Sequence, residues 1–306
     1  MGIPVRLGLD IGGTASRWVA CDPSGAVVAR GETGGASGRV FDPLERDRLS
    51  AAAHLAAQAL AQQGLVAERV IAGLTGFGPG AADEVKAVLA QPLALAHTSV
   101  LAVDDMTLAY LEQFAPGEGH LVSAGTGSFG LHIAADGSRI RVGGRGILID
   151  DAGSGAWIAL RALDHIFRGY DRHASFGADS VLAEELLGAI GGNSWDDVRQ
   201  YVYGGDRGRI GTLSVAVARA ATHGDAAAAA ILRAAGTELA RLATALVGRA
   251  GSLPVALVGR VLDLHLVVRE QVVRMLAAET VHVRRTDAAL AAARLQTNTL
   301  GVALQA

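Results

Sequence analysis

Residues able to do chemistry appear near the N-terminus, where an apolar run from Leu7 ends on Asp10 and is followed by Gly12, Gly13 and Thr14. Glycines directly after a strand allow the backbone to approach a bound group closely, and successive backbone amides can bind a phosphate. A carboxylate at the end of the same strand can hold a hydrated Mg²⁺ ion. The stretch therefore indicates either a site for a metal-bound phosphate or a plain glycine hairpin with an incidental aspartate.

The basic residues exclude two familiar nucleotide-binding designs. Lys86 is the one lysine among 27 lysines and arginines, and it lies in an ordinary helical pattern. A Walker A loop requires Gly-Lys-Ser/Thr, and a protein kinase requires a strand lysine beside its glycine-rich loop. The Rossmann fingerprint is excluded as well, because the segment after the glycines, ASRWVACD, is typical of a second strand rather than a helix.

Composition narrows the class of protein further. The 306 residues suit one or two domains, and the net charge of −3 gives no electrostatic case for a nucleic-acid partner. No apolar run reaches the roughly 18 residues that a membrane span needs, and the N-terminus lacks a signal-peptide pattern. Cys21 is the one cysteine, which excludes an internal disulfide and any metal site built on several cysteines. We therefore expect a soluble, cytoplasmic protein without a membrane partner.

An internal repeat favours the phosphate interpretation of the first glycines. Shifted by 114 positions, LGLDIGGTASRWVACDPSGAVV matches LVSAGTGSFGLHIAADGSRIRV, and both indicate strand, glycine turn, strand, aspartate turn and strand. The matched pairs are Leu7 with Leu121, Gly13 with Gly127, Thr14 with Ser128, Val19 with Ile133, Asp22 with Asp136 and Ser24 with Ser138. Because Ala124 replaces Asp10 in the second copy, one metal-holding acid would serve two phosphate loops. The repeat predicts two related halves that hold a phosphate chain between them.

Two later segments pair acids with the start of a helix. VLAVDD is typical of a buried strand, and the helical pattern MTLAYLEQF follows it, so Asp104 or Asp105 could cap that helix or do chemistry. GGRGILIDDAGSGAWI is a glycine-rich loop followed by a helix from about Ser154. There Asp150 and Asp151 could complement the positive helix end or bind a ligand's hydroxyl groups. Residues 225–247 predict a long helix whose apolar stripe serves the core or a dimer contact.

Together these motifs resemble the actin–hexokinase–Hsp70 superfamily, and within it the N-acetylglucosamine kinase group of the BadF/BadG/BcrA/BcrD ATPase family. The resemblance covers most of the chain except about 165–230. It implies an α/β fold of two ribonuclease H-like (actin-like ATPase) domains with a nucleotide cleft between them. We expect the domains at 1–118 and 119–306, with the segment APGEGH as a hinge and a final helix in 287–299 that could pack back on the first domain. The matching segments are GLDIGGT, VIAGLTGFG, VDDMTLAY, SAGTGSFG, GGRGILIDDAGSGAWI and VALVGR.

The same resemblance implies ATP and Mg²⁺ as cofactors and gives each matching residue a role. Asp10 would hold the metal, and Asp105 would be the catalytic base that also contacts the acceptor sugar. The nucleotide would be bound by Gly12, Gly13, Thr14, Gly125, Thr126, Gly127, Ser128 and Gly259. The sugar would be bound by Ser37, Asp105, Gly144, Arg145, Gly146 and Asp151.

Some positions depart from the family pattern. Arg145 stands where the family's animal members carry tryptophan, and an arginine there could alter the acyl contact or admit an unacetylated or charged sugar. Ala152 stands where they carry an acid. Arg260 replaces a common glycine of the adenosine-side motif, where it could stack on the base or weaken the site. Ser37 is the nearest polar substitute for an asparagine expected near residue 36.

We therefore expect an ATP-dependent kinase of amino sugar metabolism, forming a homodimer, that phosphorylates the 6-hydroxyl group of N-acetylglucosamine or glucosamine. Two other classes stay open. An ATPase activator of a dehydratase or reductase needs an iron–sulfur cluster at a dimer interface, and Cys21 from two subunits would supply only two thiolates. A non-catalytic regulator that binds sugar or nucleotide is kept open by Ala152, Arg260 and the missing asparagine.

Overall fold

The computed structural model describes residues 2–177, 180–205 and 207–295. Contacts between residues divide the chain into two compact units, each with its own five-stranded sheet. Unit 1 consists of Met1–Gly117, Ala134–Ser138 and Thr286–Ala306, and unit 2 of Glu118–Ile133 and Arg139–Arg285.

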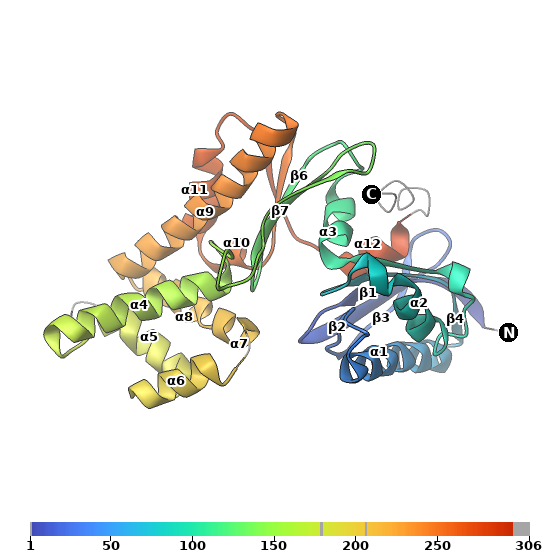
Figure 1. The fold of residues 1–306 in the computed structure, drawn as a ribbon, viewed down its shortest axis with the longest axis horizontal. Coiled ribbons are helices and arrows are strands. Elements are labelled where there is room, and N and C mark those ends of the chain that lie inside the picture. Colours follow the sequence, from blue (N-terminus) through green and yellow to red (C-terminus); the bar gives the residue numbers. More distant parts are fainter. Residues whose placement is uncertain (1, 178–179, 206, 296–306) are drawn as a thin grey trace. The chain divides into compact units, whose positions relative to one another are not determined.

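The sheet of unit 1 combines an antiparallel meander with two parallel strands (Figure 1). Its strand order is β3-β2-β1-β4-β5, in which β2 runs antiparallel to β1 and β3, and β4 runs parallel to β1 and β5. This arrangement confirms the predicted meander at the N-terminus. The strands are β1 (Ile3–Ile11), β2 (Ala15–Cys21), β3 (Val27–Gly34), β4 (Leu65–Leu74) and β5 (Val100–Asp104).

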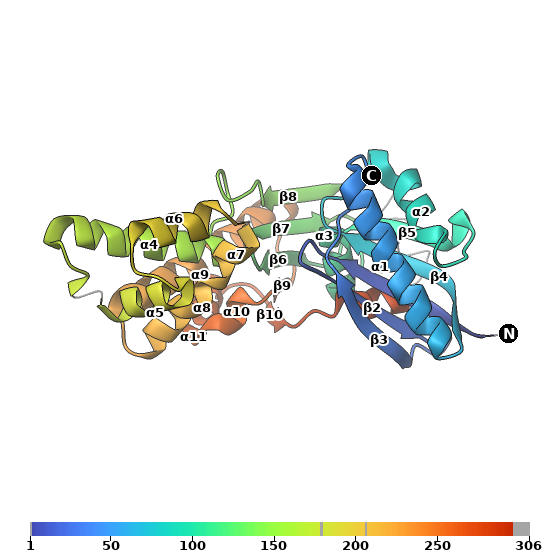
Figure 2. The same ribbon diagram turned by 90° about the horizontal axis from the view of Figure 1, so that it is seen from below.

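Helices cover both faces of this sheet (Figure 2). Side chains alternate along β1, so Leu7 and Leu9 pack into an apolar core with α1 and α2, while Gly8 faces α12 on the other side. The helices are α1 (Pro43–Gln62), α2 (Ala82–Ala90), α3 (Asp105–Gln113) and α12 (Ala288–Arg294), with short 3₁₀ turns η1 (Pro79–Ala81) and η2 (His97–Ser99).

Unit 2 repeats the strand order of unit 1 as β8-β7-β6-β9-β10. The strands are β6 (His120–Ala124), β7 (Ser128–Ile133), β8 (Arg139–Gly143), β9 (Val255–Val258) and β10 (Val281–Arg284). The helices are α4 (Gly155–His173), α5 (Ser180–Ile190), α6 (Trp195–Tyr203), α7 (Arg207–Thr212), α8 (Ser214–Thr222), α9 (Ala226–Ala250), α10 (Val261–Leu264) and α11 (Leu266–Met275). The long helix predicted over 225–247 is therefore present, and its apolar stripe packs into the core of unit 2 against the sheet and α11.

The two copies of the repeat agree at the aspartate turn but differ at the glycine turn. In the aspartate turns, the amide of Ser24 donates to Asp22 and the amide of Ser138 donates to Asp136, both at 2.9 Å. In the glycine turns, Asp10 pairs with Arg17, seven residues on, whereas Ala124 pairs with Ser128, only four residues on. The ungapped match of Thr14 with Ser128 is therefore wrong, because the first hairpin is three residues longer.

The C-terminal helix α12 packs on the sheet of unit 1 through an unusually close backbone contact. A Cβ atom on Gly8 would overlap the carbonyl oxygen of Ala289 and the backbone nitrogen of Ala293. The helix is also held at its start, where Asp287 N donates to Glu112 Oε1 at 2.7 Å. The predicted helix over 287–299 is thus present in its first part, and residues 296–299 lie outside the described residues.

The close contact at Gly8 predicts a specific loss of stability. We expect Gly8→Ala to lower the free energy of unfolding by about 1–3 kcal/mol, because the methyl group must displace α12 or bend β1. Gly34→Ala is the control, since Gly34 lies in the same sheet with open space around a Cβ atom, and we expect little change there. Urea unfolding followed by circular dichroism measures both, and equal stabilities of the two variants would contradict the close contact.

Candidate functional site

Asp10 lies half-buried at the end of β1, among other charged groups of unit 1. Burial raises the pKa of its carboxyl group, and the negative charges of Asp105 and Asp287 raise this pKa further. Arg17, its partner on β2, acts in the opposite direction. A carboxylate crowded by others of the same sign favours a bound cation beside it.

The glycine turn after Asp10 leaves open space beside its backbone. No described protein atom lies within 4 Å of the position that a Cβ atom on Gly13 would take, and neither Gly12 nor Gly13 has a positive φ angle. Packing and backbone strain therefore give no reason for a glycine at 13, whereas a group bound next to the backbone would. A hydrogen bond also links the turn to the segment after β3, because Ala36 N donates to the carbonyl oxygen of Gly12 at 3.0 Å.

The structure separates the roles of the two acids at the start of α3. Asp104 is the N-cap: its Oδ1 accepts from Thr107 N at 2.8 Å, and its Oδ2 accepts from Thr107 Oγ1 at 2.6 Å. Asp105 is the first residue of the helix, and its charge acts on the carboxyl group of Asp10. The capping role that the sequence left open thus belongs to Asp104.

Ser37 lies in a closed network in unit 1. It is buried, its Oγ donates to Glu45 Oε2 at 2.7 Å, and the same oxygen accepts from Arg39 N at 3.3 Å. The bond from Ser37 is the main cause that lowers the pKa of the Glu45 carboxyl group. Ser37 therefore links its loop to α1, and its role toward a sugar stays a prediction.

In unit 2 the glycine loop 125–127 lies against the start of α4. Gly155 N donates to the carbonyl oxygen of Gly125 at 2.9 Å, and Ser128 Oγ donates to the carbonyl oxygen of Ala152 at 2.7 Å. Ser154 caps the helix by accepting from Trp157 N at 3.2 Å. The positive end of the helix dipole therefore lies next to the loop, which favours a phosphate there.

A cavity of about 190 Å³ adjoins this loop and the start of α4. Thr126, Gly211 and Arg260 line it, so the position at which Arg260 departs from the family pattern lies in the wall of this cavity. Gly259 has φ +107° and touches the backbone of Ala124 so closely that a Cβ atom would overlap it. Helices α7 and α8 complete the wall, a contribution of 165–230 that the sequence did not reveal, although the glycines of GRIGT were the available signal.

Asp151 is the most deeply buried of the predicted site acids, with 3% of its surface exposed. Burial raises the pKa of its carboxyl group, which Arg207 and the amides of Ser128 and Gly146 partly offset. Its Oδ2 has no hydrogen-bond partner among the described residues, and the guanidinium group of Arg207 is 3.7 Å away, too far for a hydrogen bond. Buried oxygens of this kind are rare without a partner, so the atom is suited to accept from a ligand.

Asp151 also connects the predicted sugar residues with the glycine loop. A Cβ atom on Gly127 would lie 3.1 Å from Asp151 Oδ2. Gly144 and Gly146 both have positive φ angles and shape the turn in which Arg145 N donates to the carbonyl oxygen of Asp150 at 3.1 Å. The guanidinium group of Arg145 is turned to Asp150, with 2.9 Å between Nη1 and Oδ2.

A large cavity of about 1060 Å³ adjoins these residues within unit 2. Arg145, Asp150 and Asp151 line one part of it, and Trp157 from the first turn of α4 lines it as well. Sequence analysis missed Trp157, whose signal was an aromatic residue three positions after the helix cap. The cavity therefore offers a carboxylate for hydroxyl groups and an aromatic side chain in one place.

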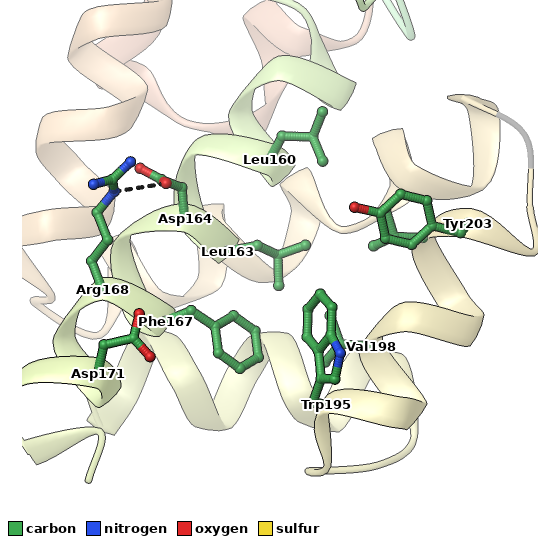
Figure 3. A pocket seen from close by; sticks show the side chains of 10 residues that line it. Leu160, Leu163, Asp164, Phe167, Arg168, Asp171, Trp195, Val198 and Tyr203 are labelled. Carbon is green, nitrogen blue, oxygen red and sulfur yellow. Dashed lines mark hydrogen bonds and ion pairs between the residues drawn. The ribbon is translucent and has the colours of Figure 1, made fainter. Parts of the chain in front are cut away.

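A third cavity, of about 490 Å³, lies between α4 and α6 and contains none of the predicted site residues (Figure 3). Phe167, Trp195 and Tyr203 give it an aromatic lining. At its rim, Arg168 forms an ion pair with Asp164 at 2.7 Å.

Cys21 is fully buried beneath α12, in contact with Ala289 and Ala293. Burial raises the pKa of its thiol group, which disfavours the thiolate that an iron–sulfur cluster needs.

In the part of the chain that the structure describes, no group of three or more histidine, cysteine, aspartate or glutamate side chains could hold a metal ion. No helix among the same residues is long and apolar enough to span a membrane.

Solved structures identify the class of this duplicated fold. A protein from Chromobacterium violaceum, provisionally described as an N-acetylglucosamine kinase, has a TM-score of 0.72 at 25% identity, over 94% of this chain and 96% of its own. A ROK family glucokinase from Streptomyces griseus, solved with glucose and AMPPNP, has a TM-score of 0.60 at 17% identity, over 94% of this chain and 97% of its own. The predicted α/β fold of two actin-like ATPase domains is thus confirmed.

Within this class, the chain belongs to the BadF/BadG/BcrA/BcrD ATPase family, which it matches over residues 7–293. A curated relative, the N-acetylmuramic acid/N-acetylglucosamine kinase of Clostridium acetobutylicum, is 30% identical over 142 residues. That match covers 46% of this chain and 45% of the relative, so it spans less than half of either protein. The family resemblance read from the sequence is therefore confirmed.

The burial of Asp151 predicts a pH dependence of stability opposite to that of a carboxyl group whose folded pKa is lowered. Because its folded pKa is raised above the ordinary value, the carboxyl group favours folding at low pH, and this contribution is lost as the pH rises through the folded pKa. We expect Asp151→Asn to gain stability relative to wild type between pH 4 and pH 7, because the amide is never charged. Urea unfolding at the two pH values measures the change.

Asp136 provides a control of opposite sign. A bond from Ser138 is the main cause that lowers the pKa of the Asp136 carboxyl group, so its stabilising contribution is present above the ordinary value of 3.8 and is lost as the pH falls below it. Asp136→Asn should therefore lose stability relative to wild type as the pH rises from about 2.5 to about 5, which urea unfolding measures. A loss for Asp151→Asn as well would mean that the buried carboxylate is net stabilising.

Proposed function

We propose that the protein is an ATP-dependent kinase that phosphorylates the 6-hydroxyl group of an amino sugar, N-acetylglucosamine or glucosamine. The observation that carries the proposal is the buried Oδ2 of Asp151, which has no hydrogen-bond partner among the described residues and lies beside the glycine loop 125–127. It offers an acceptor for sugar hydroxyl groups next to backbone amides suited to phosphate. Membership of an ATPase family and likeness to sugar kinases support the same reaction class.

In this proposal the two glycine turns bind the phosphate groups and Asp10 holds the metal ion. Mg²⁺ usually keeps several waters and takes one or two protein carboxylates together with phosphate oxygens, so the single half-buried Asp10 fits it without a larger cluster of acids. When bound, the ion would neutralise charge that builds on the phosphates. In this proposal the nucleotide is held by Gly12, Gly13, Thr14, Gly125, Thr126, Gly127, Ser128 and Gly259.

Asp105 is the proposed base. As the sugar's hydroxyl oxygen attacks the γ-phosphorus, its proton passes to the Asp105 carboxylate, and the bond from the γ-phosphorus to the bridging oxygen of ADP breaks. Asp104 is unsuited to this task because both of its oxygens are engaged by Thr107. The sugar itself is assigned to Asp105 and Ser37 of unit 1 and to Gly144, Arg145, Gly146 and Asp151 of unit 2.

The residues named in this proposal come from both units, and we propose functional domains at 1–118 and 119–306. We further propose that the protein forms a homodimer and is located in the cytoplasm. An assay of ATP consumption against a panel of amino sugars and hexoses tests it. Consumption that depends on an amino sugar and yields its 6-phosphate supports the kinase. ATP hydrolysis without any sugar dependence would favour the activator class, and binding without turnover would favour a regulator.

The two neighbouring acids make a matched pair for testing the base. We expect Asp105→Asn to lower kcat roughly 10²–10⁴-fold, because the amide cannot accept the proton, while ATP still binds. Asp104→Asn keeps a good N-cap and should change kcat only slightly. Steady-state kinetics and calorimetry with ATP measure both, and equal losses in the two variants would remove Asp105 from the role of base.

The metal role of Asp10 has a separate signature. We expect Asp10→Asn to raise the Mg²⁺ concentration needed for half-maximal activity, because the neutral side chain holds the cation weakly. Glu32→Gln is the control. Glu32 is exposed and pairs with Arg17, so this variant also removes a negative charge near Asp10 but leaves the proposed metal ligand in place. A Mg²⁺ titration at fixed ATP measures the shift, and an unchanged requirement in Asp10→Asn would refute the assignment.

A further inference from the structure

The aromatic cavity between α4 and α6 contains none of the residues assigned above to ATP, Mg²⁺ or the sugar. Its volume of about 490 Å³ falls within the roughly 300–1,000 Å³ typical of small-molecule sites. All the residues that line it belong to unit 2. The cavity therefore has the size of a binding site, and the proposed kinase reaction does not use it.

One face of each helix provides the wall of this cavity. On α4 the lining side chains recur every three or four residues from Leu160 to Asp171, which puts them on one face of the helix. On α6 they recur in the same way from Trp195 to Val202. The two faces enclose a hollow between them instead of packing tightly against each other.

Three aromatic side chains contribute to the wall (Figure 3). The rings of Phe167 and Trp195 meet edge to face, with 5.7 Å between their centroids and 85° between their planes. Trp195 is nevertheless 54% exposed and Tyr203 is 77% exposed, so both keep ring surface available to a ligand. The face of an aromatic ring carries partial negative charge and attracts cations.

The charged groups of the aromatic cavity leave one carboxylate unbalanced. Two acids and one arginine line it, so the wall carries surplus negative charge. Arg168 Nε donates to Asp164 Oδ1 at 2.7 Å, which balances these two charges. Asp171 lies one helical turn after Phe167 and makes no hydrogen bond or ion pair with any described residue. A carboxylate without a counter-ion in the described structure therefore adjoins an aromatic wall.

The large cavity of unit 2 has the opposite balance of charge. Five arginines and three acids line it, and among the described residues three of these arginines have no carboxylate within ion-pair distance, namely Arg141, Arg161 and Arg249. The two cavities therefore favour ligands of opposite charge, and a cation is attracted to the aromatic cavity rather than to the large one.

We propose that the aromatic cavity binds a small organic cation, an ammonium group carried on an apolar body. The ring faces of Trp195 and Tyr203 attract the cation, and the carboxylate of Asp171 balances its charge. An anion would be repelled by the same carboxylate, and a neutral apolar ligand would gain contact with the rings alone. This site goes beyond the proposed kinase activity and does not depend on it.

Two probes of the same shape test the preference for a cation. Choline carries a quaternary ammonium group, whereas dimethylbutanol has a carbon atom in place of the nitrogen and is neutral. Saturation-transfer NMR of the probe's methyl groups measures the binding of each to the full chain. We expect choline to bind about 2- to 30-fold more tightly than dimethylbutanol, the range expected for a cation on aromatic rings. Added salt should weaken the binding of choline only.

Three variants of the wall should change the affinity for choline in opposite directions. Asp171→Asn should weaken it about 2- to 5-fold, because the counter-ion is lost. Trp195→Leu should also weaken it, because an apolar side chain remains without a ring face. Arg168→Gln should strengthen it, because the change removes a positive charge from the wall and frees the carboxylate of Asp164. The affinity for dimethylbutanol should be unchanged in Asp171→Asn and Arg168→Gln.

Asp196→Asn is the matched control for Asp171→Asn. Asp196 follows Trp195 in the first turn of α6, but it pairs with Arg199 at 3.1 Å and does not line the cavity. This variant loses the same charge and should bind choline as wild type does. All the substituted residues are exposed, so the fold should be kept, which circular dichroism checks.

The remaining outcomes would overturn the inference. Equal binding of the two probes by wild type, or no binding of choline, would refute a cation site. Equal losses in Asp171→Asn and Asp196→Asn would mean that choline responds only to the overall charge. If sedimentation shows a dimer that Trp195→Leu dissociates, the aromatic face is a contact between two copies of the chain rather than a small-molecule site. These measurements need no sugar phosphorylation, so a failure of the proposed kinase would leave this inference standing.

Discussion

Two hydrogen bonds between the glycine loop of unit 2 and the start of α4 hold its candidate site together. Gly155 N donates to the carbonyl oxygen of Gly125, and Ser128 Oγ donates to that of Ala152. They fix the loop beside a helix N-terminus, and they bring Asp151 close to Gly127. The cavity with Trp157 and Arg161 follows from the same attachment, because both side chains leave α4 within its first two turns.

The two copies of the repeat differ in how each glycine turn could accommodate the negative charge of a phosphate. In unit 1 the hairpin has one more residue pair, Ile11 with Ser16, and a turn that is one residue longer, and an acid precedes it, which suits a phosphate bound through a cation. In unit 2 the turn is shorter, Ala124 replaces the acid, and the positive end of α4 faces the loop. A direct phosphate contact is favourable only in the second arrangement, since Asp10 would repel an anion that came without a cation.

Much of the fold could be predicted from the sequence because its signals are local. Alternating apolar residues and aspartate turns gave the meanders, and the apolar stripe of α9 gave the longest helix. The turn offset between the copies escaped prediction, since an ungapped comparison cannot reveal which residues face each other across a hairpin. For the site, the residue types near Asp10 and Asp151 could be read, but the contact of Arg207 with Asp151 joins distant segments without any local pattern.

The charges of the chain have to be considered locally rather than as a sum. A net charge of −3 over 306 residues gives no strong field, yet Asp10 lies among the negative charges of Asp105 and Asp287, while three arginines of the large cavity lack a carboxylate partner in the described structure. For the half-buried Asp10 this crowding costs free energy unless a cation offsets it, whereas the exposed arginines are solvated and their lack of a partner costs little. Arg145 shows why such charges cannot be interpreted from the sequence alone, because its ion pair with Asp150 balances a charge that the sequence presented as a possible determinant of sugar specificity. Arg161, in contrast, has no carboxylate partner among the described residues and lies over the ring of Trp157. Which arginine keeps an unbalanced charge therefore depends on the contacts of its neighbours, which the sequence does not show.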